Sequence, residues 1–286
     1  MTDFREKRYQ EASSALESNL KDHPQHAASH HLLGLVLSLQ GKNEAAQFHL
    51  QKSLELSPRH PAYAVNFAKF CLQRGAVKRA EQILEQTVKT SPSPSAFELL
   101  ALIRLDQNQG KEAVRLLEES LKLDGDAASS WYYLGLAHHS LGVFDSAIVC
   151  YQKKLQRTPM DFNGHLQLGK VYLTRGNWAE ALRHLTIAKE ARPAASEVHR
   201  YLSQLYLAGG DLQSALSSAR RAVELSQRDF GAHYQLGQVL ARLGKADEAD
   251  KEFRWLQENP ASEEPGPLAR WRQLFDRPPN SSHATP

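Results

Sequence analysis

The sequence predicts an all-α protein built as a solenoid of paired helices, and three observations carry this prediction. A pattern of small, apolar and proline residues recurs along most of the chain. Within each repeat, apolar residues are spaced three and four apart, which is the period of an amphipathic helix. A glycine near the middle of each repeat divides it into two short helices. Repeats of this kind stack on their neighbours and bury a continuous core.

The period is clearest in a column of small residues, in which Gly135 and Gly169 are 34 residues apart. A large apolar residue directly precedes each small residue, and an alanine lies twelve positions after each small residue. A large side chain at a small position would push the two helices apart, so we expect them to cross most closely there. The small residues are Gly34, Ala68, Ala101, Gly135, Gly169, Ser203 and Gly237, and the alanines are Ala46, Ala80, Ala113, Ala147, Ala181, Ala215 and Ala249.

Glycine and proline mark the ends of the helices. Proline closes many of the repeats because it cannot continue the helical hydrogen-bond ladder, as at Pro58 and Pro159. Gly125 replaces it in the third repeat. The glycines expected between the two helices of a repeat are Gly41, Gly75, Gly110, Gly142, Gly176, Gly210 and Gly244.

These markers set the expected order of elements. Residues 1–26 form a half repeat or cap helix, 264–276 a capping helix over the last repeat, and 277–286 a disordered tail. For the half repeat two interpretations stay open: a natural cap with a polar outer face, or one end of a longer array. The seven full units are 27–60, 61–93, 94–127, 128–161, 162–195, 196–229 and 230–263.

Taken together, the columns resemble those of the tetratricopeptide repeat family over about residues 27–263. The resemblance implies a right-handed superhelix of helix pairs whose first helices line a concave groove. It also implies a scaffold or adaptor that binds other proteins and is not an enzyme. The sequence departs from the family where a tryptophan is usual in the first helix. That column reads His30, Ala64, Phe97, Trp131, His165, His199 and His233.

Composition excludes several other classes of protein. The 35 basic and 32 acidic residues give a net charge of +3, which is too balanced to indicate a partner such as nucleic acid or a membrane surface. No apolar stretch is long enough to span a membrane and the N-terminus has no secretory leader, so we expect a cytoplasmic protein. Two cysteines cannot form a disulfide scaffold.

Catalytic and metal-binding patterns are missing from the sequence. Histidines of one repeat column lie about 10 Å or more apart in such a stack, too far to share a zinc ion. Cys71 and Cys150 are on helices of different repeats, and neither has a histidine positioned by sequence as its base. We therefore expect no catalytic residues, no metal and no cofactor.

The expected function is to bind an extended peptide or a partner helix in the groove. The resemblance places the binding residues on the first helices, although the leucines among them could instead pack against the next repeat. Lys170 and Arg200 suggest an acidic ligand, whereas the basic clamp that some relatives use for chaperone tails is not matched. An alternative is the repeat arm of a larger enzyme or secretion or assembly system; partner identity and oligomeric state stay open. The candidate residues are Asn66, Lys69, Leu102, Tyr132, Leu136, Leu166, Lys170, Arg200, Gln204, Tyr234 and Gln238.

Overall fold

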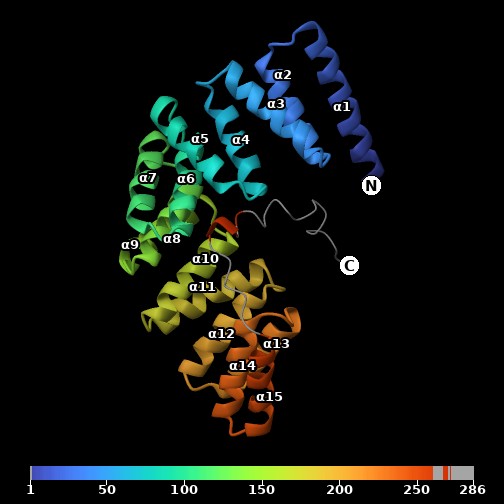
Figure 1. Ribbon diagram of the computed structural model, residues 1–286. Helices are drawn as coiled ribbons and strands as arrows, with labels where there is room; N and C mark the ends of the chain where they lie inside the picture. The colour runs from blue at the N-terminus through green and yellow to red at the C-terminus, as the bar shows by residue number, and fades with distance from the viewer. Residues whose placement is uncertain (1, 260–266, 270, 272–286) are drawn as a thin grey trace. The chain divides into compact units, whose positions relative to one another are not determined.

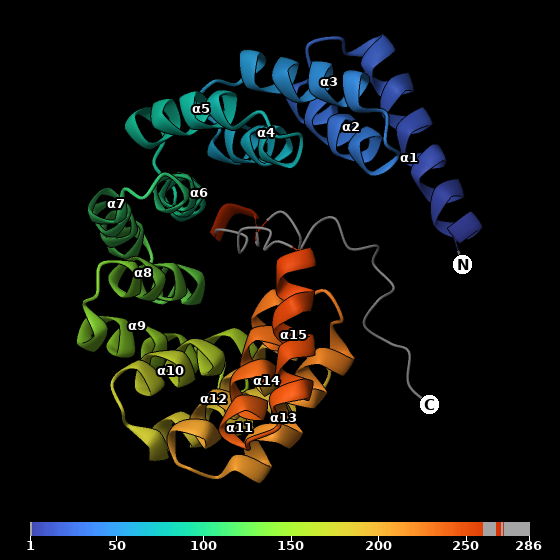
Figure 2. The same ribbon diagram turned by 60° about the horizontal axis from the view of Figure 1, so that its bottom comes forward.

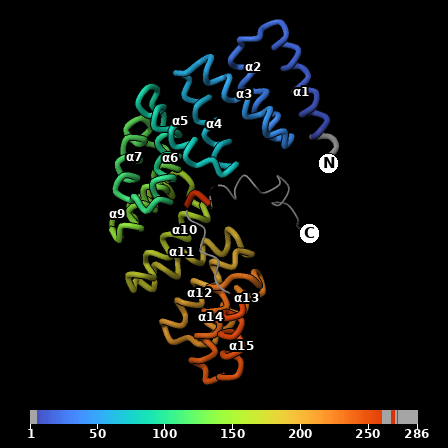
Figure 3. The backbone as a smooth tube through the Cα atoms, viewed as in Figure 1, coloured from blue at the N-terminus to red at the C-terminus, as the bar shows by residue number. Residues whose placement is uncertain are grey.

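The computed structural model describes residues 2–259, 267–269 and 271, and the regular elements of this part are α-helices (Figures 1 and 3). It has two compact units: Met1–Gly125 with Pro265–Pro286, and Asp126–Glu264. The repeat pattern does not predict this division, which falls at the glycine that replaces the closing proline of the third repeat. Within the described ranges, every helix is too short or too polar to cross a lipid bilayer.

In the first unit, a single helix is followed by three helix pairs. α2 packs on α3, α4 on α5 and α6 on α7, and α1 packs on α2 as the second helix of a preceding repeat would. Figure 2 shows α2, α4 and α6 on one side of this unit, with α3, α5 and α7 on the other. The helices are α1 (Thr2–Asp22), α2 (Ala27–Leu39), α3 (Asn43–Leu56), α4 (Pro61–Gln73), α5 (Val77–Thr90), α6 (Pro94–Asp106) and α7 (Gly110–Leu123).

The second unit contains four helix pairs, packed as α8 on α9, α10 on α11, α12 on α13 and α14 on α15. Its first helices also contact one another, α10 with α12 and α12 with α14, so they form one layer. The all-α solenoid of consecutive helix pairs is therefore confirmed. The helices are α8 (Ala128–Ser140), α9 (Phe144–Arg157), α10 (Phe162–Thr174), α11 (Trp178–Ala191), α12 (Ser196–Ala208), α13 (Leu212–Leu225), α14 (Phe230–Arg242) and α15 (Ala246–Glu258).

Close packing between the two helices of a repeat explains the column of small residues. A Cβ atom added to Gly169 would lie 2.6 Å from Cγ of Leu185, which is closer than two carbon atoms can approach. On Gly34 it would lie 2.7 Å from Cγ of Leu50. Ala181, in the alanine column, is completely buried. The expectation that the helices cross most closely at the small positions is confirmed at these glycines.

The turn between the two helices of a repeat requires a left-handed backbone conformation. Gly41 and Gly176 both have φ of 74°, a conformation that glycine adopts without steric cost. In the third repeat the residue in this conformation is Asn108, with φ of 59°, and Gly110 is the first residue of α7. The prediction that Gly110 forms this break is therefore wrong. Asparagine can replace glycine here because its short polar side chain tolerates the left-handed region.

Histidines in the first-helix column tie their helix to the preceding turn. Nε2 of His165 lies 2.8 Å from the carbonyl oxygen of Pro159, so Nε2 carries the proton and Nδ1 is an acceptor in the neutral ring. Nδ1 in turn lies 2.8 Å from Nδ1 of His184 on the paired helix, and His30 and His49 repeat this distance in the first unit. Burial, followed by the charge of His165, lowers the pKa of His184 to about 4. His184 is therefore neutral at physiological pH.

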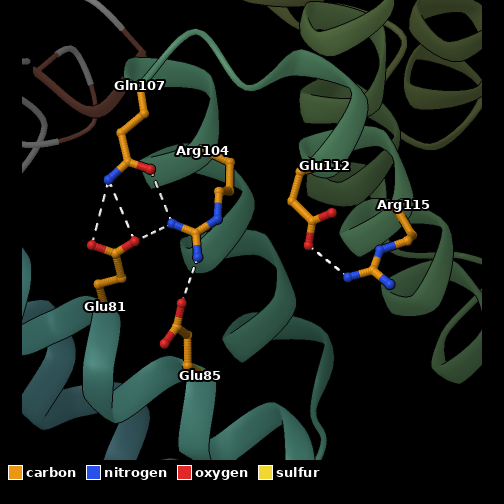
Figure 4. Close-up of polar contacts among 6 residues, drawn as sticks. All are labelled: Glu81, Glu85, Arg104, Gln107, Glu112 and Arg115. Carbon is orange, nitrogen blue, oxygen red and sulfur yellow. Dashed lines mark hydrogen bonds and ion pairs between the residues drawn. The ribbon is translucent and has the colours of Figure 1, made fainter.

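A charged cluster joins two successive repeats of the first unit (Figure 4). Arg104 on α6 donates to the carboxylates of Glu81 and Glu85 on α5, with a distance of 2.6 Å from its Nη2 to Oε1 of Glu85. Gln107 accepts a further bond from Arg104 at 2.9 Å. Because the arginine side chain is mostly buried and its bonds are charge-assisted, the cluster holds α5 and α6 in one register.

The expected capping helix over 264–276 lies only partly within the described residues. Residues 267–269 and 271 are helical, and Leu268 and Trp271 are buried. This short stretch belongs to the first unit, whereas α14 and α15 of the last repeat belong to the second. The expected tail at 277–286 lies outside the described residues.

Candidate functional site

The predicted binding residues lie on the first helices of the repeats. Some of them belong to the first unit and the others to the second. α4 and α6 carry three of them, and α8, α10, α12 and α14 carry two each. The first unit therefore holds Asn66, Lys69 and Leu102, and the second holds Tyr132, Leu136, Leu166, Lys170, Arg200, Gln204, Tyr234 and Gln238.

In the first unit, most of this set is already engaged within the protein. Nδ2 of Asn66 lies 3.1 Å from Nε2 of His31 on α2, and the ring of His31 packs on Tyr63 with centroids 4.6 Å apart. Burial lowers the pKa of His31, which keeps its ring neutral. Leu102 is completely buried and Lys69 is half-buried. The predicted residues of the first unit thus present little free surface to a ligand.

In the second unit, the apolar members of the set differ in exposure. Leu166 is 2% exposed and packs with Leu202 of α12. It therefore stabilises the packing of the helices and offers little surface to a ligand. Tyr132 and Leu136 are half-buried and pack against the core between α9 and α10. Tyr234 on α14 is 47% exposed. Aromatic and aliphatic contact area is therefore available on α8 and α14.

The two basic members of the second unit, Lys170 and Arg200, lie beside Tyr201. Nζ of Lys170 lies 5.1 Å from the centre of this ring, and the guanidinium carbon of Arg200 lies 4.7 Å from it. The ammonium of Lys170 is also 3.8 Å from a carboxylate oxygen of Glu197. Burial, followed by the positive charge of Lys170, lowers the pKa of His139 on α8. The charge of Lys170 on α10 therefore also acts on the neighbouring first helix, α8.

The remaining two members of the set add amide groups to the layer of first helices. Gln204 on α12 is exposed, and Gln238 on α14 is half-buried. Each amide offers both donors and acceptors, which suits the backbone of an extended peptide.

Sequence reasoning missed two residues that organise this cluster. Tyr201 was not among the predicted contacts, although an aromatic residue directly beside a basic residue on a helix can indicate a cation–π contact. Gly231 was also missed: a Cβ atom at this position would lie 2.8 Å from Nη1 of Arg200. The signal was a glycine within the first turn of α14, where a better helix former would stabilise the helix.

The two thiols are poorly suited to nucleophilic chemistry. Cys71 and Cys150 are buried, and burial raises the pKa of each to about 11. A thiol with such a pKa is protonated at neutral pH, whereas the thiolate is the reactive form. Across the residues that the structure describes, histidine, cysteine, aspartate and glutamate form no group of three or more that could hold a metal ion.

Comparison with known families gives matches along most of the repeat region. Models described as tetratricopeptide repeat match residues 37–103, 99–159, 166–230 and 204–263. The last three ranges alone cover more than half of the chain.

The individual relatives and solved structures are distant in sequence. The human antiviral innate immune response effector IFIT1 is 25% identical over 236 residues, which cover 70% of this chain and 49% of the relative. The chain therefore spans about half the length of this relative. Among solved structures, the APC/C hetero-tetramer Cut9–Hcn1 matches with a TM-score of 0.68 at 16% identity, covering 81% of this chain and 46% of that one. YrrB, described as a TPR protein with an unusual peptide-binding site, matches with a TM-score of 0.53 at 18% identity, covering 65% and 96%.

Proposed function

The chain belongs to the tetratricopeptide repeat family, and from this premise we propose that it is a non-catalytic adaptor. Repeat domains of this family generally mediate contacts between proteins. The proposed ligand is an extended segment of a partner protein, bound along the first helices of the second unit. YrrB has a similar fold and is described as having a peptide-binding site, which is consistent with this use of the surface.

One observation carries the proposal: the first helices of the second unit combine apolar contact area with polar groups on a single layer. Tyr234 is a large aromatic side chain with nearly half of its surface exposed. The exposed Gln204 and the cations around Tyr201 lie on neighbouring helices of the same layer. Aromatic anchors beside groups that bond to a peptide backbone are typical of peptide-binding surfaces.

A second candidate is that the chain acts as the repeat arm of a larger enzyme or assembly. The observation that favours it is the greater length of the relatives, since IFIT1 extends well beyond the matched region. Cut9–Hcn1, a hetero-tetramer, gives a precedent for this fold inside an assembly. In both candidates the repeats themselves bind a protein segment.

A library of random peptides displayed on phage tests the proposal on the full chain. The informative variant combines Tyr234→Ala with Gln204→Ala, because both side chains are exposed and their loss should not unfold the unit. Val149→Ala is the matched control, since Val149 is an exposed apolar residue on a second helix, α9, of the same unit.

The proposal predicts that wild type and Val149→Ala enrich the same peptides, and that the double variant loses them. Circular dichroism should give the same melting temperature for all three proteins. Equal enrichment by the double variant would contradict the proposed surface, and so would the failure of the wild type to enrich any peptide.

A further inference from the structure

The first helices of the second unit have an uneven distribution of charge. Within their bounds, α8, α10, α12 and α14 together contain three lysine or arginine residues and one acidic residue, and Asp161 and Asp229 cap the N-termini of α10 and α14. The basic residues are Lys170, Arg200 and Arg242, and the acidic one is Glu197. Two of the basic residues, Lys170 and Arg200, lie close together beside Tyr201, so positive charge is concentrated there even though the whole chain is nearly neutral.

Two of these cations are held in place by one aromatic ring. Lys170 comes from α10 and Arg200 from α12, and both lie within about 6 Å of the centre of Tyr201, the range of a cation–π interaction. The side chain of Lys170 is only 16% exposed, so its position is restricted. At 3.8 Å, the carboxylate of Glu197 is beyond hydrogen-bonding distance from the ammonium. Lys170 therefore retains donors for an incoming acceptor.

Gly231 on α14 defines the position of Arg200. The space that a Cβ atom of residue 231 would need is occupied by the guanidinium: the Cβ atom would lie 2.8 Å from Nη1 and 3.1 Å from Cζ of Arg200. An alanine would force the flexible end of the arginine to move, while the backbone of α14 could stay in place. The glycine thus allows the guanidinium to lie against the start of the next helix.

From this geometry we propose that Lys170, Arg200 and Tyr201 form a subsite for one acidic side chain of the bound peptide, with Gly231 setting the position of the arginine. This inference rests on the proposed peptide-binding function. A carboxylate between an ammonium and a guanidinium makes charge-assisted hydrogen bonds, which are stronger than neutral ones. Lys170, Arg200 and Glu197 together carry a net charge of +1, which one carboxylate would neutralise.

The variants Lys170→Gln and Gly231→Ala test the subsite in different ways. The first removes a charge, whereas the second keeps every charge and only displaces the guanidinium. Since alanine is the better helix former, Gly231→Ala should melt at the same temperature as wild type or higher. Gly209→Ala is its matched control, because a Cβ atom there would have no heavy atom nearer than 3.6 Å among its described neighbours.

The first probe is the peptide that the wild type enriches most from the phage library, synthesised with a fluorescent label. The second probe is the same peptide with every aspartate replaced by asparagine and every glutamate by glutamine, which we call the amide version. By fluorescence anisotropy, wild type and Gly209→Ala should bind the acidic peptide about tenfold more tightly than the amide version. For Lys170→Gln and Gly231→Ala this preference should fall to about threefold or less. Added salt should weaken binding of the acidic peptide only.

Failure of the subsite and failure of the proposed function give different results. If both peptides bind wild type equally, or if Gly231→Ala keeps the full preference, the subsite is wrong while the peptide-binding surface stands. If Tyr234→Ala with Gln204→Ala leaves binding unchanged, the proposed surface itself is wrong. Tighter binding of a single-stranded RNA of equal length would also overturn the assignment to an acidic peptide.

Discussion

Replacing Gly169 by alanine should destabilise the second unit, even though alanine is the better helix former. The added methyl group would lie 2.6 Å from Cγ and 2.7 Å from Cδ2 of Leu185, a side chain that is completely buried. Forcing an extra carbon into such a core costs about 1–3 kcal/mol. The gain in helix propensity is about 1 kcal/mol. We therefore expect a net loss of about 0–2 kcal/mol in the free energy of unfolding, in place of the gain that alanine would otherwise bring.

Urea unfolding of the full chain, followed by far-ultraviolet circular dichroism, measures this loss. Gly209→Ala is the control, because its added methyl group would meet only ordinary van der Waals neighbours. Leu185→Ala alone should cost about 2–5 kcal/mol through the cavity that it leaves. Combined with Gly169→Ala, the new methyl group occupies part of that cavity, so the double variant should lose about 1–3 kcal/mol less than the sum of the single variants.

The close-packing account would be refuted if Gly169→Ala were as stable as Gly209→Ala. Additive losses in the double variant, within about 0.5 kcal/mol, would equally show that residues 169 and 185 do not compete for the same space.

Three further predictions follow from single sites. His184 has a pKa of about 4 in the folded state against 6.5 ordinarily, so the folded state binds fewer protons than the unfolded state. The free energy of unfolding should therefore fall by about 2 kcal/mol between pH 7.5 and 5, and by less in His184→Gln. Urea titrations at each pH measure this change. Asn108→Gly should match or exceed wild-type stability whereas Asn108→Ala loses about 1 kcal/mol, because of the left-handed φ; equal melting temperatures would contradict this. Cys71 and Cys150 should resist a thiol reagent until denaturant is added; fast labelling of the folded chain would show that they are accessible.

The repeat architecture could be predicted because the closest helix crossings leave a periodic trace in the sequence. Gly169 belongs to the column of small residues, and the structure shows that it packs directly against Leu185 of the paired helix. The glycines of the turns could also be predicted from the sequence wherever the turn residue with positive φ is a glycine. The prediction of the turn was wrong in the third repeat, because Asn108 takes the left-handed conformation there and the nearby Gly110 is the first residue of α7.

The candidate site was harder to predict, because exposure depends on what the next helix places over a residue. Leu166 and Leu136 look alike in sequence, yet Leu166 is buried against α12 and Leu136 is half-buried. Likewise, a single repeat does not reveal that Arg200 needs the space above Gly231 in the following one. Such contacts depend on side-chain positions between repeats, and a column pattern contains no information about them.

The most direct test of the central claim is photo-crosslinking of the most enriched library peptide to the full chain. The photoreactive residue benzoylphenylalanine replaces Tyr234 on a first helix or, as the control, Val149 on a second helix. If the peptide lies along the first helices of the second unit, position 234 should crosslink and position 149 should not. Crosslinking at 149 with none at 234 would contradict the account.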